Sequence, residues 1–96
     1  MDINKECKII AKWREDKGFE TNWDNMLEKL MLVVTEVSEA AEAYRKNDVK
    51  EFDMEIADTF IRLMDICGSI NLDIANEIEK KMIINAGRPY KHGKIA

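Results

Sequence analysis

Apolar side chains recur every three or four residues in four segments of the chain, which is the spacing of one face of an α-helix. Polar residues and glycines separate the segments: Gly18 after the first, Arg45 to Asp48 between the second and third, Gly68 after the third and Gly87 after the fourth. We therefore expect helices over residues 3–16, 24–45, 49–67 and 72–85. The pattern predicts one all-α, four-helix domain over residues 1–96.

Residues that favour helix N-termini precede three of the segments. Asn22 or Asp24 is expected to cap the second helix, and Asn71 the fourth. Asp48 is expected to cap the third, with Glu51 three residues later, as in a capping box. These caps place a tight turn around Asn47, so we expect the second and third helices to form an antiparallel hairpin.

The second segment is apolar on two sides. Its main stripe consists of Leu27, Leu30, Val34, Val37, Ala41 and Tyr44. Leu32 and Ala43 lie nearly opposite this stripe on a helical wheel, which is expected of a central helix with two neighbours.

The third segment is apolar over more than half of its circumference. Its stripe consists of Phe52, Ile56, Phe60, Leu63 and Cys67, and its polar side holds Glu51, Glu55, Asp58, Arg62 and Asp65. Four short helices offer too few neighbours to cover this apolar surface together with that of the second helix. We therefore expect a homodimer, or a tetramer, that packs hairpin against hairpin.

Two carboxylate pairs lie at matching positions in the hairpin. Glu36 and Asp58 are each eleven residues from Asn47, and Glu39 and Glu55 are each eight residues from it. Equal distances from the turn mean equal heights along antiparallel helices, so four carboxylates are expected to meet at one level. Clustered anions repel unless a cation holds them, and oxygen ligands suit Mg²⁺ or Mn²⁺.

Simpler interpretations of these acids stay open at this point. Glutamate is common on exposed helix faces, so Glu36 and Glu39 need not be ligands. Asp58 and Arg62 have the i, i+4 spacing of an ordinary surface ion pair.

Composition and charge narrow the range of functions. Residues 1–79 carry ten basic and all 19 acidic residues, whereas residues 80–96 carry five basic residues and no acid. The acidic body disfavours nucleic-acid binding. The basic tail, residues 86–96, suits a small polyanion chelated with a divalent ion, although it is also typical of a solubilising end.

The sequence also bears on membrane association and on the cellular compartment of the protein. It has no apolar run of 18 residues, so no membrane span is expected, and its N-terminus lacks an apolar signal core. Cys7 and Cys67 lie on apolar helix faces and are not paired in a CxxC motif, which favours reduced packing residues in a cytoplasmic protein over a zinc site.

The acids and the C-terminal segment resemble the all-α nucleoside triphosphate pyrophosphatases of the MazG-like superfamily, which is related to the dimeric dUTPases. The family pattern is ExxE, a spacer and ExxD; here it is Glu36-Val-Ser-Glu39, fifteen residues and Glu55-Ile-Ala-Asp58, followed by the basic residues of 81–94. The resemblance covers about residues 26–94. The chain departs from the pattern at Thr35, where many members have an acid, and at Ser38, where glycine is common.

The resemblance implies Mg²⁺-dependent hydrolysis of an NTP or dNTP between its α and β phosphates, giving a monophosphate and pyrophosphate. Glu36, Glu39, Glu55 and Asp58 would be the metal ligands, and Glu39 would also accept the proton of the attacking water. Lys81 and Asn85, which share one helix face, would bind phosphate oxygens together with Arg88.

Trp13 and Trp23, with Phe19 as a further candidate, would stack on the base, although tryptophans more often fill the core of a small bundle. A different class of function is also open: a non-catalytic helical interaction protein whose acids lie on the surface and bind no metal. A di-iron bundle needs Glu-x-x-His motifs, and the only histidine, His92, lies in the tail.

Overall fold

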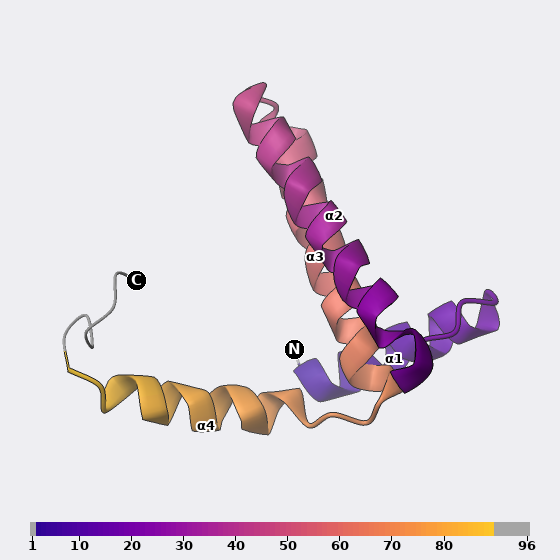
Figure 1. The fold of residues 1–96 in the computed structure, drawn as a ribbon, viewed down its shortest axis with the longest axis vertical. Helices are drawn as coiled ribbons and strands as arrows, with labels where there is room; N and C mark the ends of the chain where they lie inside the picture. Colours follow the sequence, from indigo (N-terminus) through magenta and orange to yellow (C-terminus); the bar gives the residue numbers. More distant parts are fainter. Residues whose placement is uncertain (1, 90–96) are drawn as a thin grey trace.

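The computed structural model describes residues 2–89, and within that range every regular element is helical. The elements are α1 (Ile3–Asp16), the 3₁₀ turn η1 (Trp23–Asn25), α2 (Met26–Arg45), α3 (Val49–Ser69) and α4 (Ile74–Ala86) (Figure 1). The predicted all-α architecture of four helices is thus confirmed. The predicted basic tail lies mostly outside the described residues.

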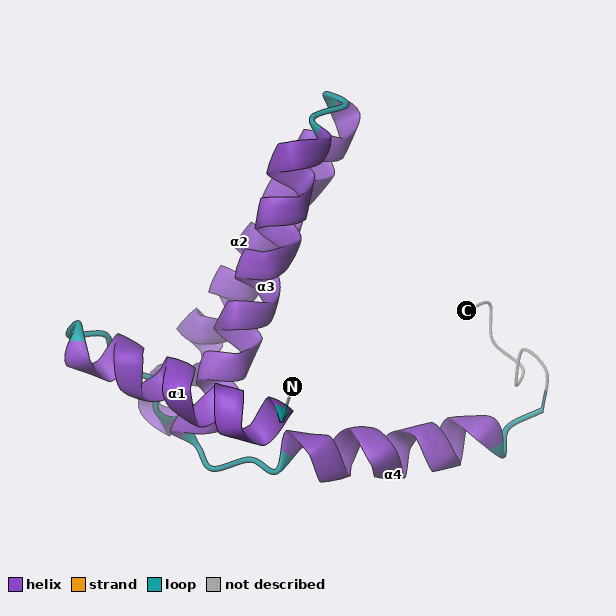
Figure 2. Cartoon of the chain, turned by 180° about the vertical axis from the view of Figure 1, so that it is seen from behind, coloured by secondary structure: helices purple, strands orange, loops and turns teal. Residues whose placement is uncertain are grey.

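α2 and α3 form a long antiparallel hairpin that projects from the rest of the molecule (Figures 1 and 2). Asn47 makes the turn with a positive φ of 58°, and the amide of Asp48 donates to the carbonyl of Ala43 at 2.9 Å. The Asp48 carboxylate accepts from the Glu51 amide at 3.0 Å, so Asp48 caps α3 as the sequence predicts. The hairpin on which the equal heights of the acids depend is therefore present.

The side of each helix that faces its partner repeats with the 3–4 spacing of a coiled-coil seam. The residues of α2 that follow this spacing are all buried or half-buried: Met26, Lys29, Val33, Glu36, Ala40 and Ala43. The same holds in α3 for Phe52, Glu55, Thr59, Arg62, Ile66 and Ser69. Charged residues therefore occupy the middle of a seam whose ends are mainly apolar or small.

The predicted apolar stripes of α2 and α3 lie mainly outside this seam. The stripe of α2, from Leu27 to Tyr44, is exposed along its length, and Ile56, Phe60 and Leu63 of α3 are also exposed. The sequence located these apolar faces, but within one chain the hairpin is closed by a neighbouring, more polar side of each helix, about 100° around the helix from the stripe.

α1 packs across the base of the hairpin against α3, where Cys7 is almost completely buried. A Cβ at Gly68 would collide with the carbonyl of Cys7 and would lie 2.9 Å from Cβ of Ala11. The prediction that Gly68 ends the third helix is wrong: α3 continues through it to Ser69. Gly68 is needed here because the backbone of α1 approaches too closely for any side chain.

A buried carboxylate fastens α1 and the loop that follows it to α3. Asp65 is 3% exposed, and its Oδ2 accepts from Nε of Arg14 at 3.1 Å and from the hydroxyl of Thr21 at 2.7 Å. Ser69 donates to the other carboxylate oxygen at 3.1 Å. These hydrogen bonds compensate the charge of Asp65, which would otherwise be costly to bury. They also hold Arg14, the residue next to Trp13, in place.

Beyond α3 the chain turns at Asn71, whose φ is 57°, and α4 points away from the hairpin (Figures 1 and 2). Asp73, and not Asn71 as predicted, caps α4, because its side chain accepts from the amide of Asn76. Asn4 of α1 holds this end: it donates to Asp73 at 2.7 Å and accepts from the amide of Ala75 at 3.1 Å. No residue of α4 is buried, and Ile78, Met82, Ile83 and Ile84 are exposed, so α4 contacts the rest of the described chain mainly near its start, against α1.

The second helix also begins differently from the prediction. Asn22 caps the short turn η1 through a reciprocal bond with Asn25, and α2 begins only at Met26. Cys7 and Cys67 are buried and unbridged, as predicted. None of the helices in residues 2–89 combines the length and the apolar character that a bilayer crossing demands.

Candidate functional site

Three carboxylates from the two helices of the hairpin meet in the middle of the seam. Glu36 and Glu39 come from α2 and Glu55 from α3, and one oxygen of each lies within 4.8 Å of the others. Glu36 is 8% exposed and Glu55 6% exposed, whereas Glu39 is open to solvent. The interpretation of Glu36 as an exposed surface residue is therefore wrong.

The cluster has a physical consequence at Glu55. The pKa of its carboxyl is raised from 4.5 to about 7, chiefly because the protonated group can share a hydrogen bond with Glu39. Burial, the charge of Glu39, a hydrogen bond with Asp58 and the charge of Glu36 raise the pKa further. In the absence of a cation, a proton bound to Glu55 therefore reduces the repulsion among the three acids.

Asp58, the fourth predicted ligand, lies at the edge of this group. It does not belong to the set of three converging oxygens, but it is close enough to Glu55 to raise the pKa of that residue. Asp58 also lines a surface hollow together with Glu36. Three of the four acids thus converge at the height that their distances from Asn47 predict, and Asp58 lies beside Glu55 on the outer side of the group.

Arg62 neutralises Glu36 from across the seam. Its Nε donates to Oε1 of Glu36 at 3.1 Å, and the side chains of the pair are 27% and 10% exposed. The proposed local pair of Arg62 with Asp58 is not the one that forms. Sequence reasoning missed Arg62 as a site residue, although its position seven residues after Glu55 puts both on one side of α3.

The hollow beside the acids has a volume of about 220 Å³ and contains groups of several chemical kinds. Its lining comprises Trp13, Arg14, Glu36, Asp58, Ile61 and Arg62. Trp13 is 52% exposed, so this tryptophan is available at the surface and does not fill the core. One predicted stacking residue thus lies in the same hollow as two of the predicted metal ligands.

Trp23 is also exposed, at 73%, and belongs to η1 at the base of α2. It does not line the hollow of Trp13. Phe19 packs below the guanidinium of Arg14, whose carbon lies 4.9 Å from the ring centre, and this contact occupies one face of the ring.

A second hollow, of about 480 Å³, opens on the side of the acids that faces the hairpin turn. Glu39, Glu42, Glu51 and Glu55 line it together with Lys46 and Asp48. Glu39 and Glu55 therefore adjoin this hollow, whereas Glu36 and Asp58 adjoin that of Trp13.

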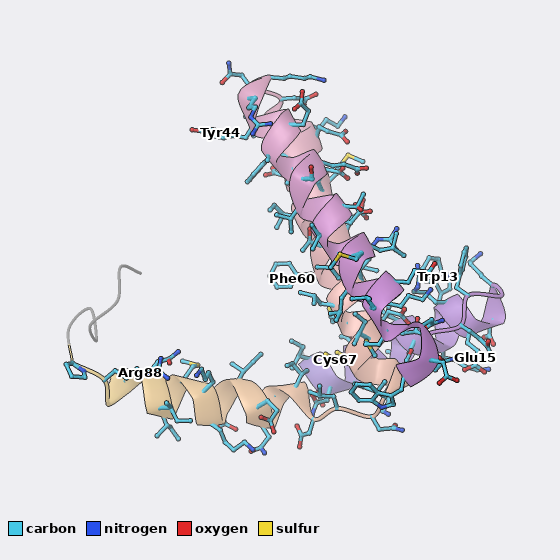
Figure 3. All side chains as sticks on the ribbon, viewed as in Figure 1. Trp13, Glu15, Tyr44, Phe60, Cys67 and Arg88 are labelled. Carbon is cyan, nitrogen blue, oxygen red and sulfur yellow. The ribbon has the colours of Figure 1, made fainter. Side chains whose placement is uncertain are left out.

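The predicted phosphate-binding residues are separate from the acids within one chain. Lys81 and Asn85 are exposed on α4, and Arg88 follows its C-terminal end. α4 extends away from the hairpin, and Figure 3 shows Arg88 far from Trp13, on the opposite side of the hairpin base. The structure thus gathers the acids and Trp13 but does not bring Lys81, Asn85 or Arg88 to them.

The donor set fits a hard divalent cation. Carboxylate oxygens are the ligands that Mg²⁺ and Mn²⁺ prefer. The hydrogen bond with Glu39, burial and the neighbouring negative charges raise the pKa of Glu55 to about 7, and a cation at the three oxygens would take the place of that proton. Glu36, Glu39 and Glu55 would hold the ion, with Asp58 available on the outer side.

No protein-family model, curated protein sequence or solved structure matches the chain. The geometry of the acids and the sequence pattern that contains them are therefore what indicates the function of the chain.

Proposed function

We propose that the protein is a Mg²⁺-dependent nucleoside triphosphate pyrophosphohydrolase, which splits an NTP or dNTP into a monophosphate and pyrophosphate. The observation that carries the proposal is the convergence of Glu36, Glu39 and Glu55 in the hairpin seam. A coiled-coil-like seam is a costly place for acids, because apolar residues there would stabilise the hairpin more. A cation-binding role accounts for their position.

The residues of the chain divide the work according to their exposure. Glu36 and Glu55 are buried in the seam and would hold the cation together with Glu39. A bound divalent cation would neutralise charge on the triphosphate and lower the pKa of the attacking water. Glu39 is the exposed member of the three converging acids, and once a cation replaces the proton that it shares with Glu55 it would be able to accept the proton of that water. Trp13 borders the acids and is 52% exposed. Nζ of Lys17 lies over one face of its ring, 5.4 Å from the ring centre, and the other face would be available for stacking on a base.

We further propose that the active form is a homodimer, or a pair of dimers, as the exposed apolar stripes of α2 and α3 suggest. The chain exposes 7516 Å², whereas a compact monomer of its 11.2 kDa exposes about 5,700 Å². The excess is about 1,800 Å² per chain, or about 3,600 Å² for two chains, which lies in the range of the total area that obligate homodimers bury, about 2,000–5,000 Å². Hairpin packing against hairpin would cover the stripes.

Such a dimer would also give α4 a role. Ile83 and Ile84 are exposed, and α4 packs mainly against α1 of its own chain. A second copy whose hairpin lies against this helix would bring its acids toward Lys81, Asn85 and Arg88. In this proposal the phosphate-binding residues act on the partner's acids, and the site is incomplete in a monomer.

The competing proposal is a non-catalytic helical interaction protein. The exposed apolar stripes favour it as much as they favour a dimeric enzyme, because both need a partner for the hairpin. The two proposals differ over the acids: the interaction protein has no need of a divalent cation.

The test is pyrophosphate release from a panel of natural and damaged nucleoside triphosphates, with and without Mg²⁺. We expect Mg²⁺-dependent release for at least one of them, and Glu39→Gln to lower kcat by about 100-fold or more. Glu28→Gln is the matched control: it removes the same charge from an exposed position of α2 and should leave the rate unchanged. Equal rates for Glu39→Gln and wild type would refute the site.

A further inference from the structure

Arg62 stands between the acids and the hollow of Trp13. It belongs to the seam of α3, and its Nε is bonded to Glu36, 26 positions away in the sequence, at 3.1 Å. Glu36 is at the same time one of the three converging carboxylates. Two kinds of positive group therefore compete for one carboxylate: the guanidinium of Arg62 and a divalent cation.

The competition has a predictable direction. A divalent ion brings two charges to the cluster and is attracted by Glu39 and Glu55 as well as by Glu36. Arg62 interacts mainly with Glu36, and a cation beside that carboxylate would weaken the pair and repel the guanidinium. Arg62 is thus the counter-charge of Glu36 when no cation is bound.

Once released from Glu36, the guanidinium of Arg62 would be free to bind a phosphate group in the hollow of Trp13. Arg62 already lines the hollow that contains Trp13, next to Asp58, one helical turn earlier on α3. Its planar fork suits two oxygens of one phosphate group. The neighbouring Arg14 is already engaged, because it pairs with the buried Asp65 at 3.1 Å and covers the ring of Phe19.

We propose that Arg62 is a phosphate-binding residue that exchanges partners, pairing with Glu36 in the metal-free protein and with a substrate phosphate once a cation holds Glu36. The inference depends on the function proposed above, because it takes the triphosphate as the second partner. Cation and phosphate then bind cooperatively, since each favours the arrangement that the other needs. The residue acts in the same chain as the acids and is distinct from the residues of α4.

The test is calorimetric titration of the full chain with Mn²⁺, with and without inorganic pyrophosphate. In Arg62→Gln we expect Mn²⁺ alone to bind several-fold more tightly, because the competitor is gone, and pyrophosphate in the presence of Mn²⁺ to bind about tenfold more weakly. Opposite changes in the two affinities distinguish partner exchange from a structural role, which would weaken both.

Two further variants keep the outcome interpretable. Arg62→Lys retains a positive charge in the seam if the glutamine variant unfolds, and it should keep Mn²⁺ affinity near wild type while binding pyrophosphate several-fold more weakly. Arg45→Gln, at an exposed arginine of α2 that pairs with Glu42 near the hairpin turn, should change neither affinity.

Several results would overturn the inference. If Mn²⁺ and pyrophosphate affinities both fall, or neither changes, in the Arg62 variants while the wild type binds Mn²⁺ and hydrolyses nucleotides, partner exchange is wrong and the proposed function stands. If wild type binds no Mn²⁺, both fail together.

Discussion

At the scale of single residues, Glu55 is a buried carboxyl group whose charged form is disfavoured by its surroundings. Its folded-state pKa is about 7, raised first by its hydrogen bond with Glu39, whereas the unfolded chain has the ordinary value of 4.5. Protonation of Glu55 therefore favours the folded, metal-free state. This contribution is complete below the unfolded pKa and is lost as the pH rises through about 7.

We accordingly predict that Glu55→Gln flattens the pH dependence of stability in the absence of metal. The amide cannot ionise, so it keeps the stabilisation that the wild type loses between about pH 5 and about pH 8. Thermal unfolding in a chelator at these two pH values measures the effect, with Glu28→Gln as the charge-matched control. A wild-type curve as flat as that of Glu55→Gln would show that Glu55 does not retain a proton.

Sequence reasoning at this scale succeeded where the relation between residues was local or set by the turn. The cap at Asp48 and the equal distances from Asn47 predicted correctly that Glu36, Glu39 and Glu55 come together in the hairpin. The partner of Arg62 was missed, because the spacing to Asp58 is visible in the sequence and the contact with Glu36 exists only after the helices pair. Gly68 was misjudged for the same reason, since its role is to admit the backbone of α1.

At the scale of helices, the hydrophobic pattern predicted the elements but not the orientation of their apolar sides. α1 matches its predicted range, and the hairpin was expected. Periodicity shows which side of α2 is apolar, but it does not show whether the same chain covers that side. The stripe that contains Val34 is exposed, and the side that contains Glu36, Ala40 and Ala43 closes the hairpin.

The exposed stripe of α2 leads to a prediction about assembly. Val34 is 55% exposed in the middle of the stripe. If the proposed homodimer packs hairpin against hairpin, Val34→Lys should disfavour that interface and shift the mass from dimer toward monomer. Light scattering coupled to gel filtration measures the masses. Glu28→Lys, an exposed charge change on the same helix, is the control and should leave the mass unchanged.

The proposed interface and the proposed shared site are tested together, because in that proposal Lys81, Asn85 and Arg88 would act on the acids of a partner chain. Nucleotide hydrolysis should therefore decline together with the dimer in Val34→Lys. A wild-type protein of monomer mass at micromolar concentration with full activity would contradict both claims.

At the scale of the whole molecule, the middle of the hairpin seam holds charged side chains where apolar side chains would pack more stably. The base is fastened by close contact at Gly68 and by the buried Asp65, and the ends of the hairpin seam are mainly apolar or small. Between them the seam holds Glu36, Glu55 and Arg62. Repulsion among the acids lowers the stability of the metal-free protein, and a bound cation would recover it.

The most direct measurement is therefore the stability of the wild type with Mg²⁺ or Mn²⁺ against its stability in a chelator, near pH 8. Binding to the folded state alone should raise the free energy of unfolding by about 1.4 kcal/mol at tenfold excess over Kd and about 2.7 kcal/mol at hundredfold excess. Glu55→Gln should lose most of this gain, and Glu28→Gln should retain it. Unfolding curves that are identical with and without either cation would contradict the assignment of the acids as a metal site.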